Sequence, residues 1–312
     1  MTITQLKYVL AVAEHQNFTK AAEKCFVTQP TLSMQIQKLE DQLAIQIFDR
    51  SKKPIELTEV GRKIVNQAKN IVNEADRITD IVDQQKGFIG GEFRLGIIPT
   101  VMPTLLPMFL KTFIKRYPKI KIKIEELNTE EIIQRIKDGH LDAAIAATPL
   151  KNEHIKERVL FFEPFVGYIP NNHRLTSKKT LEVSDLDIDD MLLLEDGHCF
   201  RDGVLNLCKG LKSKDHDEFQ LESGSFEMLV KLANEGMGMT LLPYLNTLDL
   251  KETERDNLHF FNEPSPAREV SLIYHKSELK IQIIDALHKI ISGIIRGAIA
   301  FQNVQIISPV AK

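Results

Sequence analysis

The sequence predicts an α/β protein with a helical N-terminal unit, one long helix and a larger C-terminal region of strands and helices. Apolar residues recur at helical spacing through the first sixty positions, and a single apolar stripe continues from residue 59 to about 86. From residue 93 onward, short apolar runs typical of strands alternate with amphipathic segments of helix length. A chain of 312 residues can form two or three such units, each with its own core.

The first sixty residues predict a helix-turn-helix. Residues 3–13 and 18–25 have the spacing of two short helices, with Thr19 as the expected cap of the second. Thr28 and Pro30 open a third helix, because proline fits a first turn whose N–H groups are unpaired anyway. The expected buried stripe of this helix is Leu32, Ile36, Leu39 and Leu43. Two short helices, a tight connection and a third helix with a polar outer face are typical of DNA-binding units.

A wing and a long helix are expected next. Residues 47–50 and 55–58 have the pattern of two short strands around the basic tip Ser51-Lys52-Lys53-Pro54. From Glu59 to about Lys86 one helix follows, and the glycines of residues 87–91 form a hinge. The apolar stripe of the long helix is Val60, Ile64, Ala68, Ile71, Ala75, Ile78 and Val82. Because an isolated helix with one apolar stripe needs a partner, we expect a dimer formed through this helix.

The remaining chain predicts a parallel α/β layout. The first strands and helices are expected at residues 93–98, 103–116, 120–125, 129–138 and 143–147. A similar alternation runs from Phe165 to Leu242, and a strand at 269–274 and a helix at 279–296 close the region. Strands that alternate with helices in this way usually pair in parallel, with each helix crossing one face of the sheet.

Charge and hydropathy argue against a polycationic protein, a signal peptide and a membrane span. The formal net charge is −3, so any contact with nucleic acid must come from a local patch. The N-terminus has no basic start followed by a long apolar run, and charges interrupt the apolar segment from Ile283 to Ile307. We therefore expect an amphipathic helix near the C-terminus and a cytoplasmic protein without a membrane span.

The chain has three cysteines, Cys25, Cys199 and Cys208. An odd, low number argues against a framework of structural disulfides. From the residues alone, two interpretations remain open: buried small apolar side chains, or a transient redox pair. Cys25 falls on the inner face of the second helix, where a structural role is expected. A zinc site made from His198, Cys199 and Cys208 lacks the short paired spacings that zinc favours, so we expect no metal and no cofactor.

Motifs spread over the chain resemble the LysR-type transcriptional regulators. They are Ala11-Val12-Ala13-Glu14, Phe18-Thr19-Lys20-Ala21-Ala22, Thr28-Gln29-Pro30-Thr31-Leu32-Ser33, Ile36-Gln37-Lys38-Leu39-Glu40, Phe48-Asp49-Arg50 and Leu57-Thr58-Glu59-Val60-Gly61. The resemblance implies a winged helix-turn-helix in residues 1–58, a dimerising linker helix and hinge in 59–90, and a regulatory domain in 91–312. That domain would have two lobes like a periplasmic binding protein, lobe I at about 91–163 and 267–300 and lobe II at about 164–266. The chain would cross between them near Glu163-Pro164 and near Pro266–Arg268.

One block narrows the resemblance to the hydrogen-peroxide-sensing OxyR subfamily. It is Glu195-Asp196-Gly197-His198-Cys199, followed by Arg201-Asp202 and Cys208. The resemblance implies that peroxide oxidises Cys199 and that Cys208 resolves the product to a reversible disulfide, which activates oxidative-stress genes. The residues expected to support the thiolate or bind peroxide are Thr100, Thr129, His198, Arg201, Asp202 and Arg268.

The expected DNA contacts lie on the third helix and the wing. They are Thr28, Gln29, Pro30, Thr31, Ser33, Lys38, Arg50, Lys52 and Lys53. The carboxamide of Gln29 can pair with adenine, while Thr31 and Ser33 suit phosphates. Acidic residues offset much of the positive charge, so affinity should depend on several copies acting together. The family resemblance implies a homotetramer on promoter DNA that works with RNA polymerase.

The spacing of the two regulatory-region cysteines predicts a refolding switch. If residues 199 to about 211 are helical, nine steps of ~1.5 Å place Cys199 and Cys208 about 13 Å apart along the axis and on opposite faces. A disulfide needs Cα atoms within roughly 7 Å of each other. Bond formation would therefore unwind the helix, which would change how subunits pair and engage DNA.

Two other functions are compatible with parts of the sequence. A LysR-type regulator could instead bind a small metabolite between its lobes, with Thr100, Ser225 and Phe226 at lobe-lining positions. In that case a small carboxylate would stabilise the protein, and Cys199→Ser would change little. The other alternative is a thiol peroxidase with Cys199 as the reactive residue. The attached DNA-binding unit argues against it, so we expect no enzyme.

Overall fold

The computed structural model describes residues 1–85, 90–208, 225–299 and 303–309. The chain divides into two compact units, one in residues 1–88 and one in residues 89–312. Most of the expected hinge at 87–91, and the expected end of the helix at 209–211, lie outside the described residues. No helix of the described part is long and apolar enough to cross a membrane.

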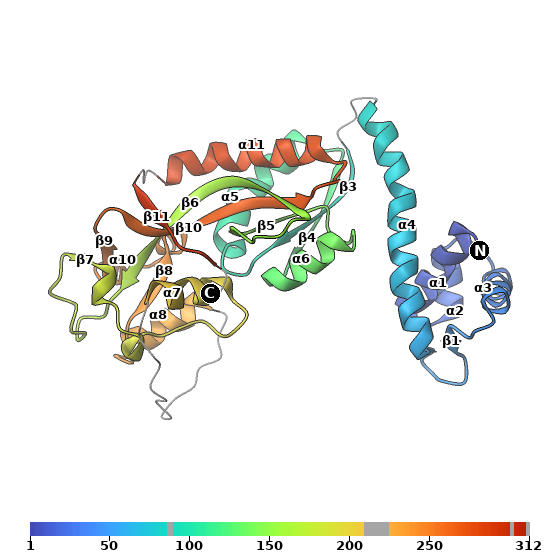
Figure 1. Cartoon of the computed structure of the whole chain (residues 1–312), viewed down its shortest axis with the longest axis horizontal. Helices are drawn as coiled ribbons and strands as arrows, with labels where there is room; N and C mark the ends of the chain where they lie inside the picture. Colours follow the sequence, from blue (N-terminus) through green and yellow to red (C-terminus); the bar gives the residue numbers. More distant parts are fainter. Residues whose placement is uncertain (86–89, 209–224, 300–302, 310–312) are drawn as a thin grey trace. The chain divides into compact units, whose positions relative to one another are not determined.

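The first unit is a winged helix-turn-helix, as the sequence predicts (Figure 1). Its elements are α1 (Ile3–His15), α2 (Phe18–Lys24), α3 (Gln29–Leu43), β1 (Phe48–Asp49), β2 (Glu56–Leu57) and α4 (Glu59–Gln85). β1 and β2 pair antiparallel, with Phe48 opposite Leu57. The three short helices share one core, in which Val9, Leu32 and Ile36 are fully buried.

Short polar side chains fix the starts of these helices. Thr28 accepts the N–H of Thr31 at the start of α3, with Pro30 in the first turn as predicted. The prediction of Thr19 as the cap of α2 is wrong, because Asn17 accepts the N–H groups of Thr19 and Lys20. Asn17 has the extended backbone that a capping residue requires, whereas Thr19 is already inside the helix. Leu43 is also misplaced by the sequence pattern, since it is 38% exposed at the end of α3.

The long helix α4 covers much of its apolar stripe within its own unit. Of the expected stripe, Ala68 is buried against the helical core, and Ile64, Ile71 and Ala75 are half-buried. Val65 and Val72, which lie outside the expected stripe, are also buried there. By contrast, Ile78 is 65% exposed. The side chain of Val82 lies outside the described residues. The dimer through this helix stays a prediction, and the exposed stripe residues Val60 and Ile78 are where a partner helix would contact it.

The second unit contains a mixed sheet rather than the parallel one predicted. Its first part comprises β3 (Gly91–Ile97), α5 (Met102–Arg116), β4 (Ile120–Glu126), α6 (Thr129–Lys137), β5 (Ala143–Thr148) and β6 (Ile155–Tyr168). The strand order is β4-β3-β5-β10-β6-β9-β7, with β10 at Ser265–His275. β3 pairs in parallel with β4 and β5, but β10 runs antiparallel to both β5 and β6. The chain returns to β10 from a distant segment, which local spacing does not reveal.

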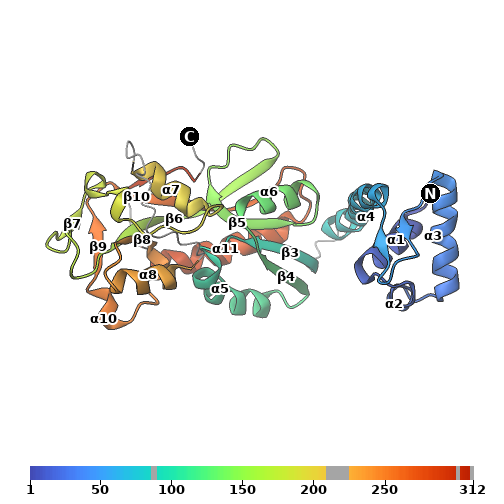
Figure 2. The same ribbon diagram turned by 90° about the horizontal axis from the view of Figure 1, so that it is seen from below.

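The rest of the second unit is made of shorter elements. They are β7 (Thr180–Leu181), η1 (Val183–Asp185), η2 (Ile188–Asp190), α7 (Cys199–Leu207), α8 (Phe226–Asn234), β8 (Thr240–Pro243), α9 (Tyr244–Thr247), α10 (Glu252–Arg255), β9 (Leu258–Phe261), α11 (Ile281–Ala298) and β11 (Val304–Ile306). α5 and α11 pack side by side, and α11 also contacts β6 (Figures 1 and 2). β8 pairs with β6, and β11 pairs with β10.

Two separate hydrophobic cores make the second unit two-lobed. The first core joins residues of β3, β5, α5 and α11, and the second joins residues of β8, α7 and α8. β6 runs through both cores, whereas β10 contributes to the first core and pairs with β6 as far as Pro164. On β6, Phe161 belongs to the first core and Phe165 to the second. β6 therefore passes from lobe to lobe around Glu163, which lies opposite Arg268 in the register of β6 and β10.

Candidate redox site and nucleic-acid interface

Cys199 is the first residue of α7. The turn before it contains Gly197, whose φ of +88° is a left-handed conformation that glycine adopts without strain. His198 then occupies the capping position with extended backbone. Cys199 is only 8% exposed and packs into the first core. A thiol at a helix N-terminus experiences the positive end of the helix dipole, which favours its thiolate form.

Arg268 joins the two lobes and forms the centre of the site. Its Nη1 donates to Thr100 Oγ1 at 2.8 Å, and its Nη2 donates to the Thr100 carbonyl at 3.1 Å. Its Nη2 also pairs with Glu163 Oε2 at 2.7 Å. The guanidinium carbon lies 5.3 Å from the centre of the Phe200 ring. Sequence reasoning selected Thr100, Cys199 and Arg268 separately, and the structure places Arg268 against both of the others.

Sequence reasoning missed Glu163, although the sequence contains a signal for it. Glu163 is fully buried, and it accepts hydrogen bonds from Arg268 Nε at 2.8 Å and from the Leu245 N–H at 2.9 Å. It interrupts the apolar run Phe161-Phe162-Glu163-Pro164-Phe165. A carboxylate in such a strand needs a buried partner, because an unpaired buried charge is strongly destabilising.

Opposing effects act on the Cys199 thiol. Burial is the largest and raises its pKa, while the positive charge of Arg268 and a hydrogen bond from Thr129 lower it. Asp202 raises it further. The balance keeps the pKa above its ordinary value, so the site in this conformation protects the thiol form. Asp202 therefore does not support the thiolate electrostatically, contrary to the expectation.

Thr129 adds a polar group with unused hydrogen-bonding capacity. Its Oγ1, at the start of α6, is buried and has no hydrogen bond of good geometry with any of the described residues. It nevertheless lies close enough to Cys199 to lower the thiol pKa. Leaving a buried hydroxyl unsatisfied costs about 1–3 kcal/mol. This arrangement suits a small polar molecule that could bond to the hydroxyl beside the sulfur.

The other predicted groups hold the turn before α7. His198 Nε2 lies 3.3 Å from Glu195 Oε1. Arg201 donates from Nη1 to the Leu194 carbonyl at 2.9 Å and pairs through Nε with Asp196 at 2.8 Å. These contacts direct the polar groups of His198 and Arg201 to residues 194–196. In this conformation they shape the loop that carries Cys199.

Cys208 caps the other end of α7 and belongs to the second core. It is 6% exposed, and both cysteines are free thiols. Burial, followed by the negative charges of Asp187 and Asp190, raises the pKa of Cys208 to about 11. The two cysteines are thus separated by the whole of α7 and buried in different cores, and both are predominantly protonated at neutral pH. The described residues contain no group of three or more metal-binding side chains.

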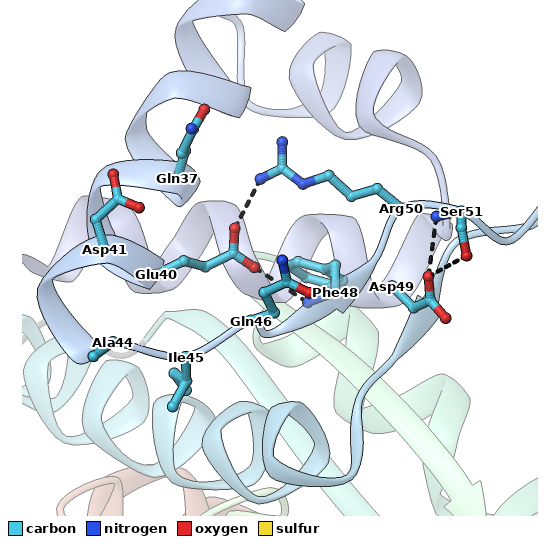
Figure 3. Close-up of a pocket in the computed structure, with 10 residues that line it drawn as sticks. All are labelled: Gln37, Glu40, Asp41, Ala44, Ile45, Gln46, Phe48, Asp49, Arg50 and Ser51. Carbon is cyan, nitrogen blue, oxygen red and sulfur yellow. Dashed lines mark hydrogen bonds and ion pairs between the residues drawn. The ribbon is translucent and has the colours of Figure 1, made fainter.

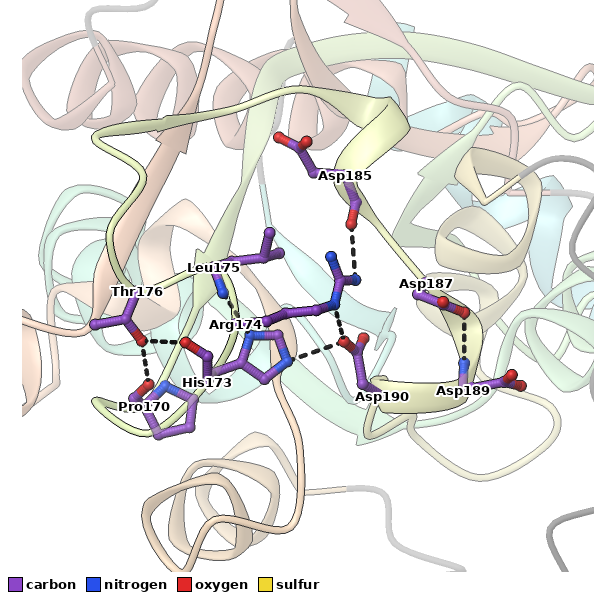
Figure 4. Close-up of polar contacts among 9 residues, drawn as sticks. All are labelled: Pro170, His173, Arg174, Leu175, Thr176, Asp185, Asp187, Asp189 and Asp190. Carbon is purple, nitrogen blue, oxygen red and sulfur yellow. Dashed lines mark hydrogen bonds and ion pairs between the residues drawn. The ribbon is translucent and has the colours of Figure 1, made fainter.

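A polar network fixes the acidic segment beside Cys208 (Figure 4). Asp190 Oδ2 hydrogen-bonds His173 Nε2 at 3.0 Å and accepts from Arg174 Nε at 2.8 Å. Arg174 also donates to the Asp185 carbonyl at 2.9 Å. Asp190 Oδ1 is buried without a partner among the described residues. The carboxylate is therefore held in place while its second oxygen keeps part of its negative charge uncompensated.

The predicted DNA-contacting residues of α3 lie mostly on its exposed side. Gln29, Pro30, Thr31 and Lys38 are exposed, whereas Ser33 is half-buried. Thr28 and Thr31 hydrogen-bond each other through their hydroxyls at 2.8 Å, in addition to the capping bond. Lys52 and Lys53, at the tip of the wing, are exposed as predicted.

Arg50 has a structural role that the sequence did not indicate (Figure 3). Its Nη2 pairs with the buried Glu40 at 2.8 Å, its Nη1 donates to Ser33 Oγ at 3.3 Å, and its guanidinium lies 5.0 Å from the Phe18 ring centre. Glu40 also accepts the N–H groups of Ile47 and Phe48. Glu40 and Arg50 therefore tie the wing to α3, beside an open groove of about 810 Å³.

Two family profiles match the chain. Residues 3–62 match the bacterial regulatory helix-turn-helix of the LysR family, and residues 86–292 match the LysR substrate binding domain. The chain belongs to the LysR family of DNA-binding transcription regulators, which are not enzymes.

Within this family the chain groups with OxyR. It is 34% identical over 276 residues to the hydrogen peroxide-inducible genes activator of Pectobacterium carotovorum, with 88% of this chain and 90% of the relative covered. It is 33% identical to the DNA-binding transcriptional dual regulator OxyR of Escherichia coli K12, with coverage of 88% and 89%. A full-length OxyR variant from Pseudomonas aeruginosa superimposes with a TM-score of 0.73 at 32% identity, covering 94% of this chain and 98% of that one. A Corynebacterium glutamicum OxyR variant with bound H2O2 gives 0.64 at 28% identity, covering 98% of each chain.

Proposed function

We propose that this chain is a transcription regulator that senses hydrogen peroxide through Cys199 and Cys208. The observation that carries the proposal is the position of α7, which begins at one cysteine in the first core and ends at the other in the second. A covalent bond between the two sulfurs is incompatible with this helix, because a Cα separation of about 13 Å far exceeds the roughly 7 Å that a disulfide allows.

The surroundings of Cys199 suit peroxide as the oxidant. Peroxide is small and polar, and it can bond to the unsatisfied Oγ1 of Thr129 and to groups around Thr100 and Arg268. The thiolate of Cys199 attacks one peroxide oxygen, the O–O bond breaks, and the sulfur becomes a sulfenic acid. The other oxygen leaves as hydroxide and takes up a proton to form water. Arg268 supports both the thiolate and the departing negative charge.

Resolution then requires Cys208 to leave the second core. Its thiolate attacks the sulfur of Cys199, an S–S bond forms as the S–O bond breaks, and the hydroxyl leaves as water after taking up a proton. The segment from Cys199 onward must unwind for this step. The reduced helix and the disulfide form are then two structures of one segment, and peroxide determines which is populated.

Each of three consecutive segments of the chain has one proposed role. Residues 1–58 bind promoter DNA, residues 59–90 link and pair two copies through α4, and residues 91–312 sense the oxidant. The exposed Ile78 on α4 supports pairing, and two such pairs would make a homotetramer. The unwinding of the segment from Cys199 onward would change the regulatory unit and alter the spacing of the DNA-binding units. This would change their engagement with RNA polymerase and so activate oxidative-stress genes.

Thiol mass spectrometry tests the proposal. The purified reduced chain is treated with one equivalent of H2O2, quenched with an alkylating reagent and digested. We expect a peptide pair joined by a Cys199–Cys208 bond, and we expect Cys208→Ser to accumulate Cys199 as sulfenic acid. Cys25→Ser is the matched control, and it should leave the bond unchanged.

Two results would contradict the proposal. If both thiols stay free under peroxide while a small carboxylate stabilises the chain, the protein is a metabolite-responsive regulator of the same family. If Cys199→Ser regulates a promoter in response to peroxide as the native chain does, the sensing residue lies elsewhere.

A further inference from the structure

Phe26 occupies an unusual position in the helix-turn-helix. It lies in the turn between α2 and α3, two residues before the capping Thr28. Its side chain is 96% exposed, the largest exposure among the large apolar side chains of the described residues. Its φ of +55° is a left-handed conformation that is unfavourable for a bulky residue and natural for glycine. Neither packing nor backbone geometry therefore explains a phenylalanine at this position.

Met34 is a second exposed apolar residue on the same unit. Its side chain is 60% exposed on α3. It lies three residues after Thr31 and four after Pro30, so it shares their face of the helix. Lys38 follows four residues later on that face. Met34 is therefore in the middle of the surface that a recognition helix presents to a major groove.

Electrostatics alone do not account for how this surface would recognise DNA. Lys38 is the only basic residue in α3, and Arg50 is already engaged by Glu40. Glu23 and Lys24, the exposed charged residues just before Phe26, have opposite charges. Major-groove edges offer one strongly apolar group to such a surface, the C5 methyl of thymine. A carboxamide like that of Gln29 pairs with adenine, the partner base of thymine.

We propose that Phe26 and Met34 are specificity-determining residues that contact thymine methyl groups in the major groove of the operator. This inference rests on the DNA binding included in the proposed function. It assigns the chain a preference for A·T pairs that is read by apolar contact beside the Gln29 carboxamide. Phe26 keeps its unfavourable backbone conformation because the ring contributes to binding.

Replacing thymine by deoxyuridine tests the proposal, since it removes only the methyl group. Operator duplexes are first selected from a random pool with the full-length reduced chain. Each thymine of the selected site is then replaced in turn, and affinities are measured by fluorescence anisotropy for the native chain, Phe26→Gly and Met34→Ala. For the native chain we expect a loss of about fourfold per contacted methyl, which corresponds to ~0.8 kcal/mol per buried methyl group.

Each variant should be insensitive to the replacement at its own thymine. Phe26→Gly should also unfold at an equal or higher temperature than the native chain, because glycine relieves the left-handed backbone. Lys38→Ala is the control, and it should weaken binding to all sequences and reduce the salt dependence while leaving the deoxyuridine effect intact.

Three outcomes would overturn the inference. The first is that deoxyuridine replaces every thymine without loss of affinity. The second is an equal loss of affinity for both variants and the native chain. The third is that the variants change the mass of the protein in solution and not its DNA affinity, which would make Phe26 and Met34 a contact between copies. A native chain that selects no duplex at all would refute DNA binding itself, and this failure is visible at the first step.

Discussion

Replacing Arg268 by glutamine is expected to weaken both the fold and the reactivity of Cys199. In the native chain the side chains of Arg268 and Glu163 are only 3% and 1% exposed and lie 2.7 Å apart. Arg268→Gln leaves the Glu163 carboxylate buried without a cation, and removing one partner of such a pair typically costs about 3–5 kcal/mol. The double variant Arg268→Gln/Glu163→Gln leaves no charge behind. It should lose only hydrogen bonds, at about 0.5–1.5 kcal/mol each, and be the more stable of the two.

The loss of stability and the loss of Cys199 reactivity are measured separately. Urea unfolding of the reduced proteins gives the free energies of unfolding, and stopped-flow loss of the Cys199 thiol gives the rate with H2O2. Because Arg268 lowers the pKa of Cys199, both variants that lack it should react more slowly than the native chain. Glu163→Gln alone keeps the cation and should react at least as fast. Equal stability of Arg268→Gln and the double variant would refute the buried-charge reasoning, and unchanged rates without Arg268 would refute its electrostatic role.

Four further predictions concern the thiols and the linker helix. Thr129→Val should raise the stability by up to about 1–3 kcal/mol, since it removes a buried hydroxyl without a good partner. It should also slow oxidation of Cys199 about 5–10-fold through loss of one hydrogen bond of ~1–1.4 kcal/mol to the peroxide, and equal thiol-loss rates would contradict this. Disulfide formation should accelerate about tenfold per pH unit above neutrality, because only the thiolate of Cys208 attacks and its pKa is about 11. Asp190→Asn removes a charge that raises the pKa of the buried thiol, but it should leave the rate at each pH unchanged in quenched mass-spectrometric time courses, because Cys208 leaves the second core before it attacks. A faster Asp190→Asn would show instead that Cys208 loses its proton while it is still buried beside Asp190. Ile78→Glu should shift the protein towards monomers in light scattering, and an unchanged mass would place the dimer contact elsewhere.

Local features of the fold could be predicted from the sequence closely. The start of α3 at Thr28 and Pro30 and the extent of α4 depend on capping and on apolar spacing within a few residues. A strand at the place of β10 was predicted, but its antiparallel pairing with β5 was not, because this pairing joins segments more than one hundred positions apart. The prediction of Thr19 as the cap of α2 is wrong because the sequence pattern does not distinguish between two nearby polar residues, Asn17 and Thr19, that can each cap a helix.

The candidate site was predicted as a set of residues but not as an arrangement. Cys199, Thr100 and Arg268 were named, yet the ion pair of Arg268 with Glu163 spans 105 positions and has no local signature. The sequence also suggested that nearby polar groups would activate the thiol. Burial outweighs them, and burial is a property of the packed core that no short motif encodes.

The position of α7 between two cores has a consequence for the return to the reduced state. Phe200, Val204 and Leu207 are at most 5% exposed in the second core, and Asn206 holds the C-terminal tail by donating to the Ser308 carbonyl at 3.0 Å. Removing three such apolar side chains from the core costs on the order of 5–9 kcal/mol, at about 1.5–3 kcal/mol each. For a two-electron couple this free energy raises the reduction potential of the disulfide by about 100–200 mV. If the disulfide removes these three side chains from the core, the packing of one helix thereby favours the return of the sensor to its reduced state.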